Sequence, residues 1–277
     1  MNDYEFENAT AYLKQKSCFN FDDLCLLVKL LRSPRGCPWD REQTHKSIRK
    51  NMLEEAYEAA EAIDLEDSGL LREELGDVML QAVLHAEIAE NSGGFNIGDV
   101  CTGICQKLIV RHPHVFGNAV VSGTGEVLKN WDSIKQESKG RKTASESMEG
   151  ISKALPALIR AHKIGQKAAK QNFDFASAED SLEKVLEEAE ELRQVIAEKN
   201  AARIEEETGD LLLAVVNTAR LAGVDAEEAL HRANEKFCLR FKAVEEGAAA
   251  KGASLASLNP KEMLELWEQS KRNSMKN

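Results

Sequence analysis

The sequence predicts an all-α protein built from two tandem helical-bundle domains that arose by internal duplication. Apolar residues recur at helical spacing over long stretches, and alternating strand-like runs are scarce. The chain has 277 residues, of which 43% are apolar, and this is enough for the cores of two domains. Shifting the chain by 133 residues aligns 53–89 with 186–222, with 14 of 37 positions identical.

Each half contains the same elements in the same order. An aromatic-Asp pair comes first, Trp39-Asp40 in one half and Phe173-Asp174 in the other. Two acidic helices follow, then a helix with a Lys-x-x-x-Arg pair and a helix with a Trp-x-x-x-Lys pair. The repeated order predicts that both halves fold in the same way.

The polar stretch QESKGRKTASESMEG separates the two halves and has the composition of a linker. We therefore expect an N-terminal domain at 1–135, a linker at 136–150 and a C-terminal domain at 151–277.

The overall composition argues against several classes of partner. A net charge of −11 and a pI of 5.2 disfavour DNA or RNA. No apolar run approaches the roughly 20 residues of a membrane span, and the polar, acidic first residues do not resemble a signal peptide. The six cysteines form no C-x-x-C pair, which is typical of reduced thiols. We expect a cytoplasmic protein with neither nucleic-acid nor membrane partners.

Two acidic patches in each half have helical spacing. Residues three or four apart share a helix face, so each acidic helix directs two carboxylates toward one point. The turn residues DSG at 67–69 separate the first two acidic helices, and antiparallel packing would bring their acids together. The converging acids are Glu55, Glu58, Glu74 and Asp77 in the first half, and Glu188, Glu191, Glu207 and Asp210 in the second.

These acids are expected at the edge of a core, because Asp77 and Asp210 are each followed by a strongly apolar run. Converging carboxylates repel one another, which raises their pKa values, and a divalent cation removes the repulsion. All-oxygen ligands favour Mg²⁺, with Mn²⁺ as a possible substitute. A single E-x-x-E pattern is usually a solvated helix face, but the repetition of all five acids, Glu54 and Glu187 included, argues against that interpretation.

A di-iron carboxylate bundle is a second alternative, and it needs two helical Glu-x-x-His motifs. The chain has Glu42-x-x-His45 and Glu228-x-x-His231, but these do not coincide under the repeat. The sequence therefore favours the magnesium interpretation.

Basic and aromatic pairs complete each half. A lysine and an arginine four residues apart share a helix face and suit a polyphosphate. The tryptophans are candidates for stacking on a base, although a structural role remains equally open. The pairs are Lys107/Arg111 and Trp131/Lys135 in the first half, and Lys236/Arg240 and Trp267/Lys271 in the second.

In combination these motifs resemble the all-α nucleoside triphosphate pyrophosphohydrolases. E-E-x-x-E followed by E-x-x-D is the acidic signature of that superfamily, and GCPWDREQTHKS and RHPHVFG look like its MazG family in the tandem two-domain form. The resemblance covers about residues 20 to 270. It implies Mg²⁺-dependent hydrolysis of ribo- and deoxynucleoside triphosphates to monophosphate and pyrophosphate, broad base specificity, a role in nucleotide-pool housekeeping, and a homodimer.

The resemblance also implies roles for individual residues. The C-terminal domain is the catalytic one, with the four acids of the second half as metal ligands. Our own mechanistic hypothesis is that Glu187 or Glu188 orients or deprotonates the attacking water, and the sequence does not decide between the two. Its nucleotide contacts are Lys236, Arg240, Trp267 and Lys271, with Arg203 as a weaker match where the family has a lysine. The N-terminal domain retains its equivalents, Glu55, Glu58, Glu74, Asp77, Lys107, Arg111, Trp131 and Lys135. The alternatives are a specialist enzyme similar to dUTPases or dCTPases, and a non-catalytic helical scaffold that binds nucleotides.

Overall fold

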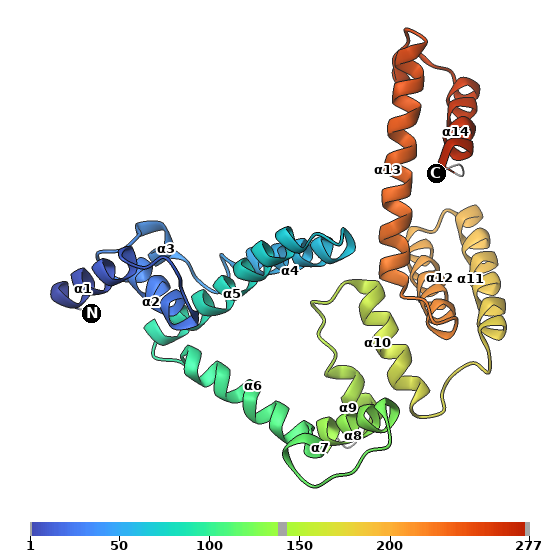
Figure 1. Cartoon of the computed structure of the whole chain (residues 1–277). Helices are drawn as coiled ribbons and strands as arrows, with labels where there is room; N and C mark the ends of the chain where they lie inside the picture. Colours follow the sequence, from blue (N-terminus) through green and yellow to red (C-terminus); the bar gives the residue numbers. More distant parts are fainter. Residues whose placement is uncertain (1, 138–142, 275–277) are drawn as a thin grey trace. The chain divides into compact units, whose positions relative to one another are not determined.

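The computed structural model describes residues 2–137 and 143–274, and the described residues form helices without strands. The chain divides into two compact units, Met1–Lys135 and Gln136–Asn277 (Figure 1). The all-α prediction and the tandem arrangement are confirmed. None of the described helices combines the length and the apolar character needed to cross a membrane.

The elements follow the order expected for each half. The helices of unit 1 are α1 (Asp3–Lys14), α2 (Phe21–Arg32), α3 (Pro38–Glu42), α4 (Arg49–Asp64), α5 (Ser68–Asn91), α6 (Ile97–Arg111), α7 (Pro113–Phe116) and α8 (Thr124–Glu137), which ends just past the boundary. Those of unit 2 are α9 (Ala144–Glu149), α10 (Ala157–Ala169), α11 (Ala178–Glu198), α12 (Ala201–Leu221), α13 (Ala226–Ala250), the 3₁₀ turn η1 (Leu255–Ser257) and α14 (Pro260–Ser274).

The two acidic helices of each unit form a hairpin with the same turn. In unit 1, Glu66 adopts φ 54°, and Asp67 then caps α5 by accepting hydrogen bonds from two backbone N–H groups at 2.9 and 3.0 Å. Unit 2 repeats this with Lys199 at φ 58° followed by the cap Asn200. The turn expected at 67–69 therefore ends at Asp67, and the serine and glycine after it belong to the first turn of α5.

The core of unit 1 lies between α2, the start of α4 and the second half of α5. Its buried residues are apolar and include Val28 and Ile48, which are 0% and 2% exposed. Val83, Leu84 and Ile88 of α5 pack against them. These positions fall after the acids of α5, so that helix has its carboxylates at one end and its core face at the other.

A histidine pair connects the loop before α4 to α5. The Nδ1 atoms of His45 and His85 lie 2.8 Å apart, the ring planes differ by 5°, and the ring centroids are 5.1 Å apart. The centroid distance exceeds the Nδ1–Nδ1 distance by about two ring radii, so the rings lie end to end and one Nδ1 donates to the other. Burial, and then the charge of His45, lower the pKa of His85. The pair joins the loop before α4 to α5.

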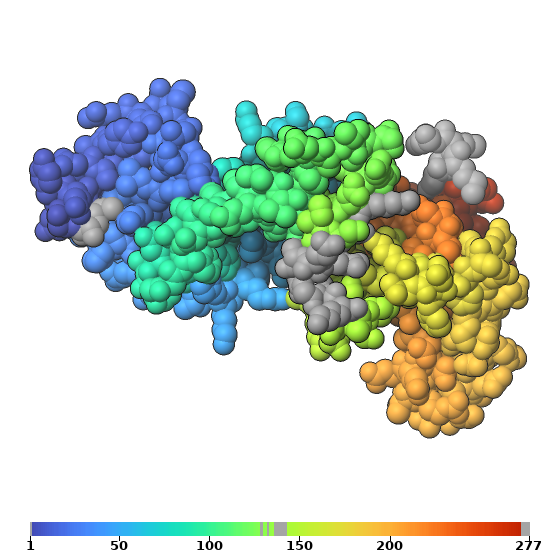
Figure 2. All heavy atoms as spheres, turned by 90° about the horizontal axis from the view of Figure 1, so that it is seen from below, coloured from blue at the N-terminus to red at the C-terminus, as the bar shows by residue number. Residues whose placement is uncertain are grey.

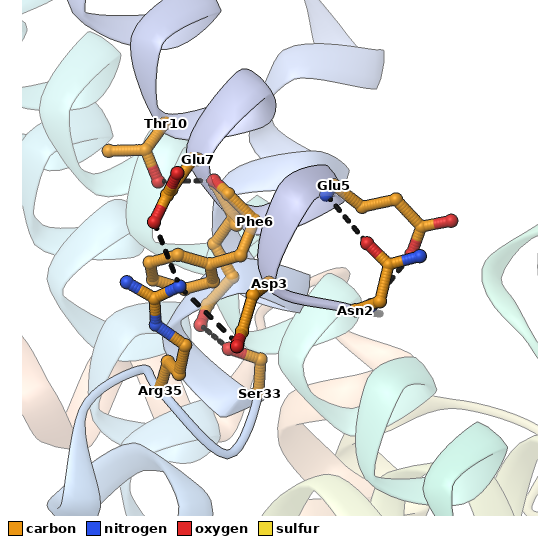
Figure 3. Close-up of polar contacts among 9 residues, drawn as sticks. Asn2, Asp3, Glu5, Phe6, Glu7, Thr10, Ser33 and Arg35 are labelled. Atoms are coloured by element: carbon orange, nitrogen blue, oxygen red, sulfur yellow. Dashed lines mark hydrogen bonds and ion pairs between the residues drawn. The ribbon is translucent and has the colours of Figure 1, made fainter.

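Arg35 attaches α1 to the end of α2 (Figure 3). Its Nη1 lies 3.3 Å from a carboxylate oxygen of Asp3 and 3.3 Å from one of Glu7. The guanidinium also lies over the Phe6 ring, 4.8 Å from its centroid. Exposed ion pairs contribute little stability individually. Their convergence on one arginine therefore mainly sets the direction of α1.

In unit 2, α11 and α12 lie against each other, as the yellow and light-orange surface of Figure 2 shows. Val195 of α11 and Val216 of α12 are buried, at 0% and 1% exposed. The hydroxyl groups of Ser181 and Thr218 share a 2.8 Å hydrogen bond across the interface. α10 packs on α12 and forms the third wall of this part of the unit.

α13 and α14 form a second hairpin within unit 2 (Figure 1). Val244, Ala248 and Leu266 form its buried cluster. A Cβ at Gly247 would lie 2.9 Å from Cδ2 of Leu266, so the absence of a side chain there permits the close approach of the two helices.

The C-terminal part of the segment expected as a linker contains a short helix. Thr143 caps α9 in a capping box with Glu146, and Ser147 is buried. α9 packs on α10 inside unit 2. Residues 138–142 of the expected linker lie outside the described residues.

Candidate functional site

Three carboxylates from α4 and α5 converge in unit 1. One oxygen from each of Glu55, Glu58 and Glu74 lies within 4.8 Å of the others. Glu74 is only 9% exposed, and Glu55 is half-buried. The charge of the fourth predicted ligand, Asp77, acts on both Glu55 and Glu74. The structure thus brings three predicted ligands together and places the fourth beside them.

Unit 2 has the equivalent cluster between α11 and α12. Glu188, Glu207 and Asp210 each contribute one oxygen to a group within 4.8 Å. Glu188 is 6% exposed, and the Glu207 side chain is 12% exposed. Glu191 lies outside this group, but its charge acts on Glu207. Both acidic clusters therefore lie at the inner face of a helix hairpin.

Burial and mutual repulsion make the ionised form of these carboxylates less favourable. Burial raises the pKa of Glu55, Glu74 and Glu207, and neighbouring carboxylates of the same cluster raise it further. A divalent cation would offset both effects, because it supplies charge where water is excluded. The donor set consists of oxygen atoms alone, which fits Mg²⁺ or Mn²⁺.

The raised pKa values predict how the stability of the metal-free protein depends on pH. A carboxyl group with a raised pKa in the folded state holds more protons there than in the unfolded chain. Its stabilising contribution is therefore present below the ordinary pKa of about 4.3 and is lost as the pH rises through the folded value. Changing Glu74 to glutamine should raise the Tm in EDTA at pH 7 and make the Tm of the variant depend less on pH between 4 and 7.

Thermal unfolding of wild type and Glu74→Gln, each with EDTA and with Mg²⁺, checks this prediction. Mg²⁺ should raise the wild-type Tm by a few degrees, because it binds only the folded cluster. The variant should gain less. A variant that is less stable than wild type in EDTA at pH 7 would contradict the assignment of repulsion at this cluster.

Lys184 is a site residue that the sequence analysis missed. Its Nζ lies 2.8 Å from a carboxylate oxygen of Glu187 and 2.7 Å from one of Glu188. These hydrogen bonds, to Glu187 first and then Glu188, raise the pKa of the Lys184 ammonium. The signal was a lysine four residues before a glutamate on one helix, which is normally a solvated pair. The repeat places Asn51 at this position in unit 1, so that unit 1 has no lysine there.

Arg203 is the second cation beside the cluster of unit 2. It lies in the first turn of α12, where its guanidinium is 2.8 Å from Glu198 and 3.9 Å from Glu207. The repeat places Leu70 at this position in unit 1. Of the predicted nucleotide contacts in unit 2, Arg203 is the one that reaches the acidic cluster.

The remaining predicted contacts of unit 1 lie on α6 and α8, and two of them touch. The Arg111 guanidinium lies 5.3 Å from the centroid of the Trp131 ring, and the His112 ring meets that tryptophan edge-on at 4.9 Å. Lys107 is exposed and Lys135 is half-buried. Trp131 therefore has structural partners in Arg111 and His112, and its contact with a base stays a prediction.

In unit 2 the equivalent residues lie on the α13–α14 hairpin. The Trp267 ring packs against Phe237 at 5.2 Å, and Lys271 donates to Glu268 at 2.7 Å. Arg240 is half-buried, and its Nε has no hydrogen-bond partner among the described residues. Lys236 is exposed. A buried guanidinium N–H without a partner is suited to an anionic ligand.

A cavity of about 460 Å³ opens on the acidic cluster of unit 2. Glu188, Asp210 and Lys184 line it where it meets the cluster, and this part is here called its polar end. The rest of the lining comes from α10, the loop before α11 and α12: Ala161, Ile164, Gly165, Ala168, Asn172, Phe173, Asp174, Phe175, Leu213, Ala214 and Asn217. The predicted contacts on α13 and α14 do not line it, so within one chain the acids face a cavity that those cations do not reach.

Comparison with known proteins agrees with this architecture. The family model of the MazG nucleotide pyrophosphohydrolase domain matches residues 43–116 and 176–244. These segments contain the acidic hairpins of the two units.

The chain is also similar over most of its length to curated proteins. It is 43% identical over 256 residues to a nucleoside triphosphate pyrophosphohydrolase of Escherichia coli K12, covering 91% of this chain and 97% of that protein. It is 43% identical over 251 residues to the nucleoside triphosphate pyrophosphohydrolase/pyrophosphatase MazG of Thermotoga maritima, covering 91% and 95%. It is 44% identical over 248 residues to the uncharacterized protein YabN of Bacillus subtilis, covering 88% of this chain and 50% of that one. With two matched domains and this similarity, the chain belongs to the MazG family of nucleotide pyrophosphohydrolases.

Proposed function

We propose that this protein hydrolyses ribo- and deoxynucleoside triphosphates to the monophosphate and pyrophosphate with Mg²⁺, accepts a broad range of bases, and so serves in nucleotide-pool housekeeping. The observation that carries the proposal is the acidic cluster of unit 2, whose Glu188 and Asp210 form one end of a nucleotide-sized cavity. The relatives in Escherichia coli and Thermotoga maritima carry the name of this activity. A mostly apolar lining supports broad base use, because apolar walls accept every base.

In this proposal the chain's own residues divide the work. A cation held by Glu188, Glu191, Glu207 and Asp210 would supply positive charge to the triphosphate and assist in activating water. Glu188 is buried and suited to holding the cation, whereas the Glu187 side chain is 57% exposed. Glu187 or Glu188 orients or deprotonates the attacking water. Both carboxylates bond Lys184, but of the two only Glu188 lines the cavity.

The cations of unit 2 then act on the phosphates. Lys184 and Arg203 are held at the cluster by ion pairs with acids, and they would turn to phosphate oxygens when those acids hold a cation instead. The attack is placed at the α-phosphorus, and pyrophosphate leaves with the negative charge that these side chains neutralise.

We further propose a homodimer, because the candidate cations of α13 and α14 do not line the cavity of their own chain. Exposed apolar side chains along α6 and α13, such as Ile104, Leu108 and Leu239, support an interface. Light scattering coupled to size exclusion should give twice the chain mass of 30.7 kDa. A monomer at micromolar concentration would contradict this part.

Identification of the products tests the proposed reaction. A mixture of ribo- and deoxynucleoside triphosphates is incubated with the protein and Mg²⁺, and the products are separated by anion exchange. Monophosphate plus pyrophosphate, lost on addition of EDTA, is the expected result. Diphosphate plus phosphate would contradict attack at the α-phosphorus. Binding without turnover would favour the scaffold alternative, and turnover of one pyrimidine deoxynucleotide alone would favour the specialist.

A further inference from the structure

We propose that the apolar end of the unit 2 cavity holds the nucleobase of the substrate, with Phe173 as the stacking face and the Asn217 amide as the polar contact. This inference rests on the proposed function and assigns nucleobase binding to the part of the same cavity away from the acids. Asp210 lies beside Glu188 in the lining, and Leu213 and Asn217 follow it one and two turns further along α12. Ile164 lines the same cavity from α10, which packs on α12. The part of the cavity away from the acids is here called its apolar end. A triphosphate held at the polar end would direct its base toward the apolar one.

The Asn217 amide has a fixed orientation. Arg220 donates to Asn217 Oδ1 from Nε at 3.0 Å and from Nη2 at 2.6 Å. Arginine has donors only, so the asparagine must present its oxygen to Arg220 and keeps its NH₂ group as a donor on another side. Asn217 lines the cavity. The amide therefore offers a fixed donor to a ring nitrogen or carbonyl oxygen of a base.

The same arginine positions the aromatic loop. Arg220 Nη2 lies 2.5 Å from Asp174 Oδ1, and Asp174 stands between the two phenylalanines of the loop. Arg220 thus connects the polar contact and the stacking face through one guanidinium. The side chains of Arg220 and Asp174 are 10% and 21% exposed, so this pair is shielded from solvent and screened less than a surface pair.

Phe173 is placed by the end of α10. The chain leaves that helix through Asn172 at φ 57°, and the Phe173 N–H donates to the Ala168 carbonyl at 3.2 Å. Phe173 is nevertheless 81% exposed, while Phe175 on the other side of Asp174 is 39% exposed. An aromatic ring held at a cavity but left uncovered has a face available for stacking on a ligand. Trp267, the aromatic that the sequence suggested for a base, instead packs on Phe237.

Gly165 lies close to both Asn217 and Arg220. A Cβ on Gly165 would lie 3.0 Å from Arg220 Nε and 3.0 Å from Asn217 Oδ1. A side chain there would press on the two groups that set the donor. Glycine at this position keeps both the hydrogen bonds and the width of the cavity.

Binding of uncleavable nucleotides tests the proposal independently of turnover. Binding is measured by calorimetry, with Mg²⁺ present, on the full chain carrying Glu55→Gln, so that a ligand of the unit 1 cluster is removed. The probes are α,β-methylene-ATP, -UTP and -CTP, with inorganic tripolyphosphate as a base-free probe. Phe173→Ala should weaken every nucleotide about tenfold, since stacking of a base on an aromatic ring contributes about 1–3 kcal/mol. The affinity for tripolyphosphate should stay within about twofold, because the polar end is unchanged. Phe95→Ala, which removes a half-exposed phenylalanine of unit 1, is the matched control and should alter neither ligand.

A second variant tests the polar contact. Asn217→Asp retains an oxygen for Arg220 but replaces the NH₂ donor with an acceptor. Uracil and cytosine differ by a carbonyl oxygen and an amino group at one edge, so the ratio of UTP-analogue to CTP-analogue affinity should shift toward CTP.

Unchanged nucleotide affinity in Phe173→Ala, or equal weakening of nucleotides and tripolyphosphate, would overturn the base pocket while leaving the hydrolytic function in place. If the ratio of UTP-analogue to CTP-analogue affinity is unchanged in Asn217→Asp, Asn217 is not part of the base pocket. Failure of the wild type to bind any of the analogues would overturn the pocket, whereas binding combined with the absence of monophosphate and pyrophosphate in the turnover assay would overturn the reaction alone.

Discussion

A chain that carries both Glu55→Gln and Glu188→Gln is expected to hydrolyse nucleoside triphosphates at least about 10²-fold more slowly than wild type. Loss of a group that merely supports a metal ligand commonly costs 10–100-fold, so loss of a ligand in each cluster should cost at least as much. Glutamine keeps the size of the side chain and removes the charge. Glu188 pairs with Lys184 at 2.7 Å, but Lys184 keeps its 2.8 Å bond to Glu187 in the variant, so we expect the variant to fold.

The single variants show which unit works. Glu188→Gln alone should account for most of the loss, since Lys184 and Arg203 lie beside the cluster of unit 2 and unit 1 has Asn51 and Leu70 at these positions. The measurement is kcat/KM from pyrophosphate release, with circular dichroism to verify folding.

Glu190→Gln is the matched control for these variants. Glu190 is on α11, two residues from Glu188, and pairs with Arg193 at 2.6 Å. It should retain full activity. If the double variant has the kcat/KM of wild type, the acidic clusters take no part in the reaction.

The acidic clusters were predictable because their geometry is local. Glu55 and Glu58 share a face for any α-helix, and so do Glu207 and Asp210. The only tertiary assumption was that a short turn folds each pair of helices back on itself. The sequence did not predict that Glu66 and Lys199 would both adopt a left-handed conformation, because neither residue type favours it. That feature becomes visible only when both turns are compared in the structure.

The cavity and its polar residues were not predictable in the same way. Asn217 follows the acids on α12 and reads as one polar residue in an apolar run. Its orientation depends on Arg220, and that of Arg220 depends on Asp174, 46 residues away in the chain. Such a relation is set by how α10 and its loop pack on α12, and helical spacing contains no information about it.

Helical spacing also did not predict the surroundings of the cations on α13 and α14. Spacing indicated that Lys236 and Arg240 share a helix face, and the repeat indicated that Trp267 belongs with them. Neither observation indicated which part of the protein that helix face contacts. In the structure Phe237, between the two cations, packs on Trp267, and no described residue of this hairpin lines the cavity.

Replacing Gly36 with alanine is expected to destabilise unit 1 by about 3 kcal/mol or more, the range of backbone clashes that cannot relax through a side chain. Gly36 begins the GCPWD stretch, directly after the chain turns back from α2. An added Cβ would lie 2.2 Å from the carbonyl oxygens of both Leu30 and Leu31. These are backbone atoms of the last turn of α2, and the Leu31 carbonyl also accepts from the Cys37 N–H at 2.7 Å. Relief of the clash therefore requires loss of that hydrogen bond and movement of the corner.

Movement of this corner would also break the hydrogen bonds of a buried arginine. Arg32, 9% exposed, donates from Nη1 to the backbone carbonyls of Asp40 and Gln43, so moving the corner would leave its guanidinium without those acceptors. Urea unfolding and hydrogen exchange of α2 measure the effect, and protection across Phe21–Arg32 should fall first. Gly103→Ala is the matched control, because nothing lies within 4 Å of its new Cβ in the middle of α6. It should stabilise by about 0.5–1 kcal/mol, since alanine forms helix better than glycine. Equal unfolding midpoints for the two variants would mean that the corner yields without cost, and the GCPWD stretch would then have no structural reason for its glycine.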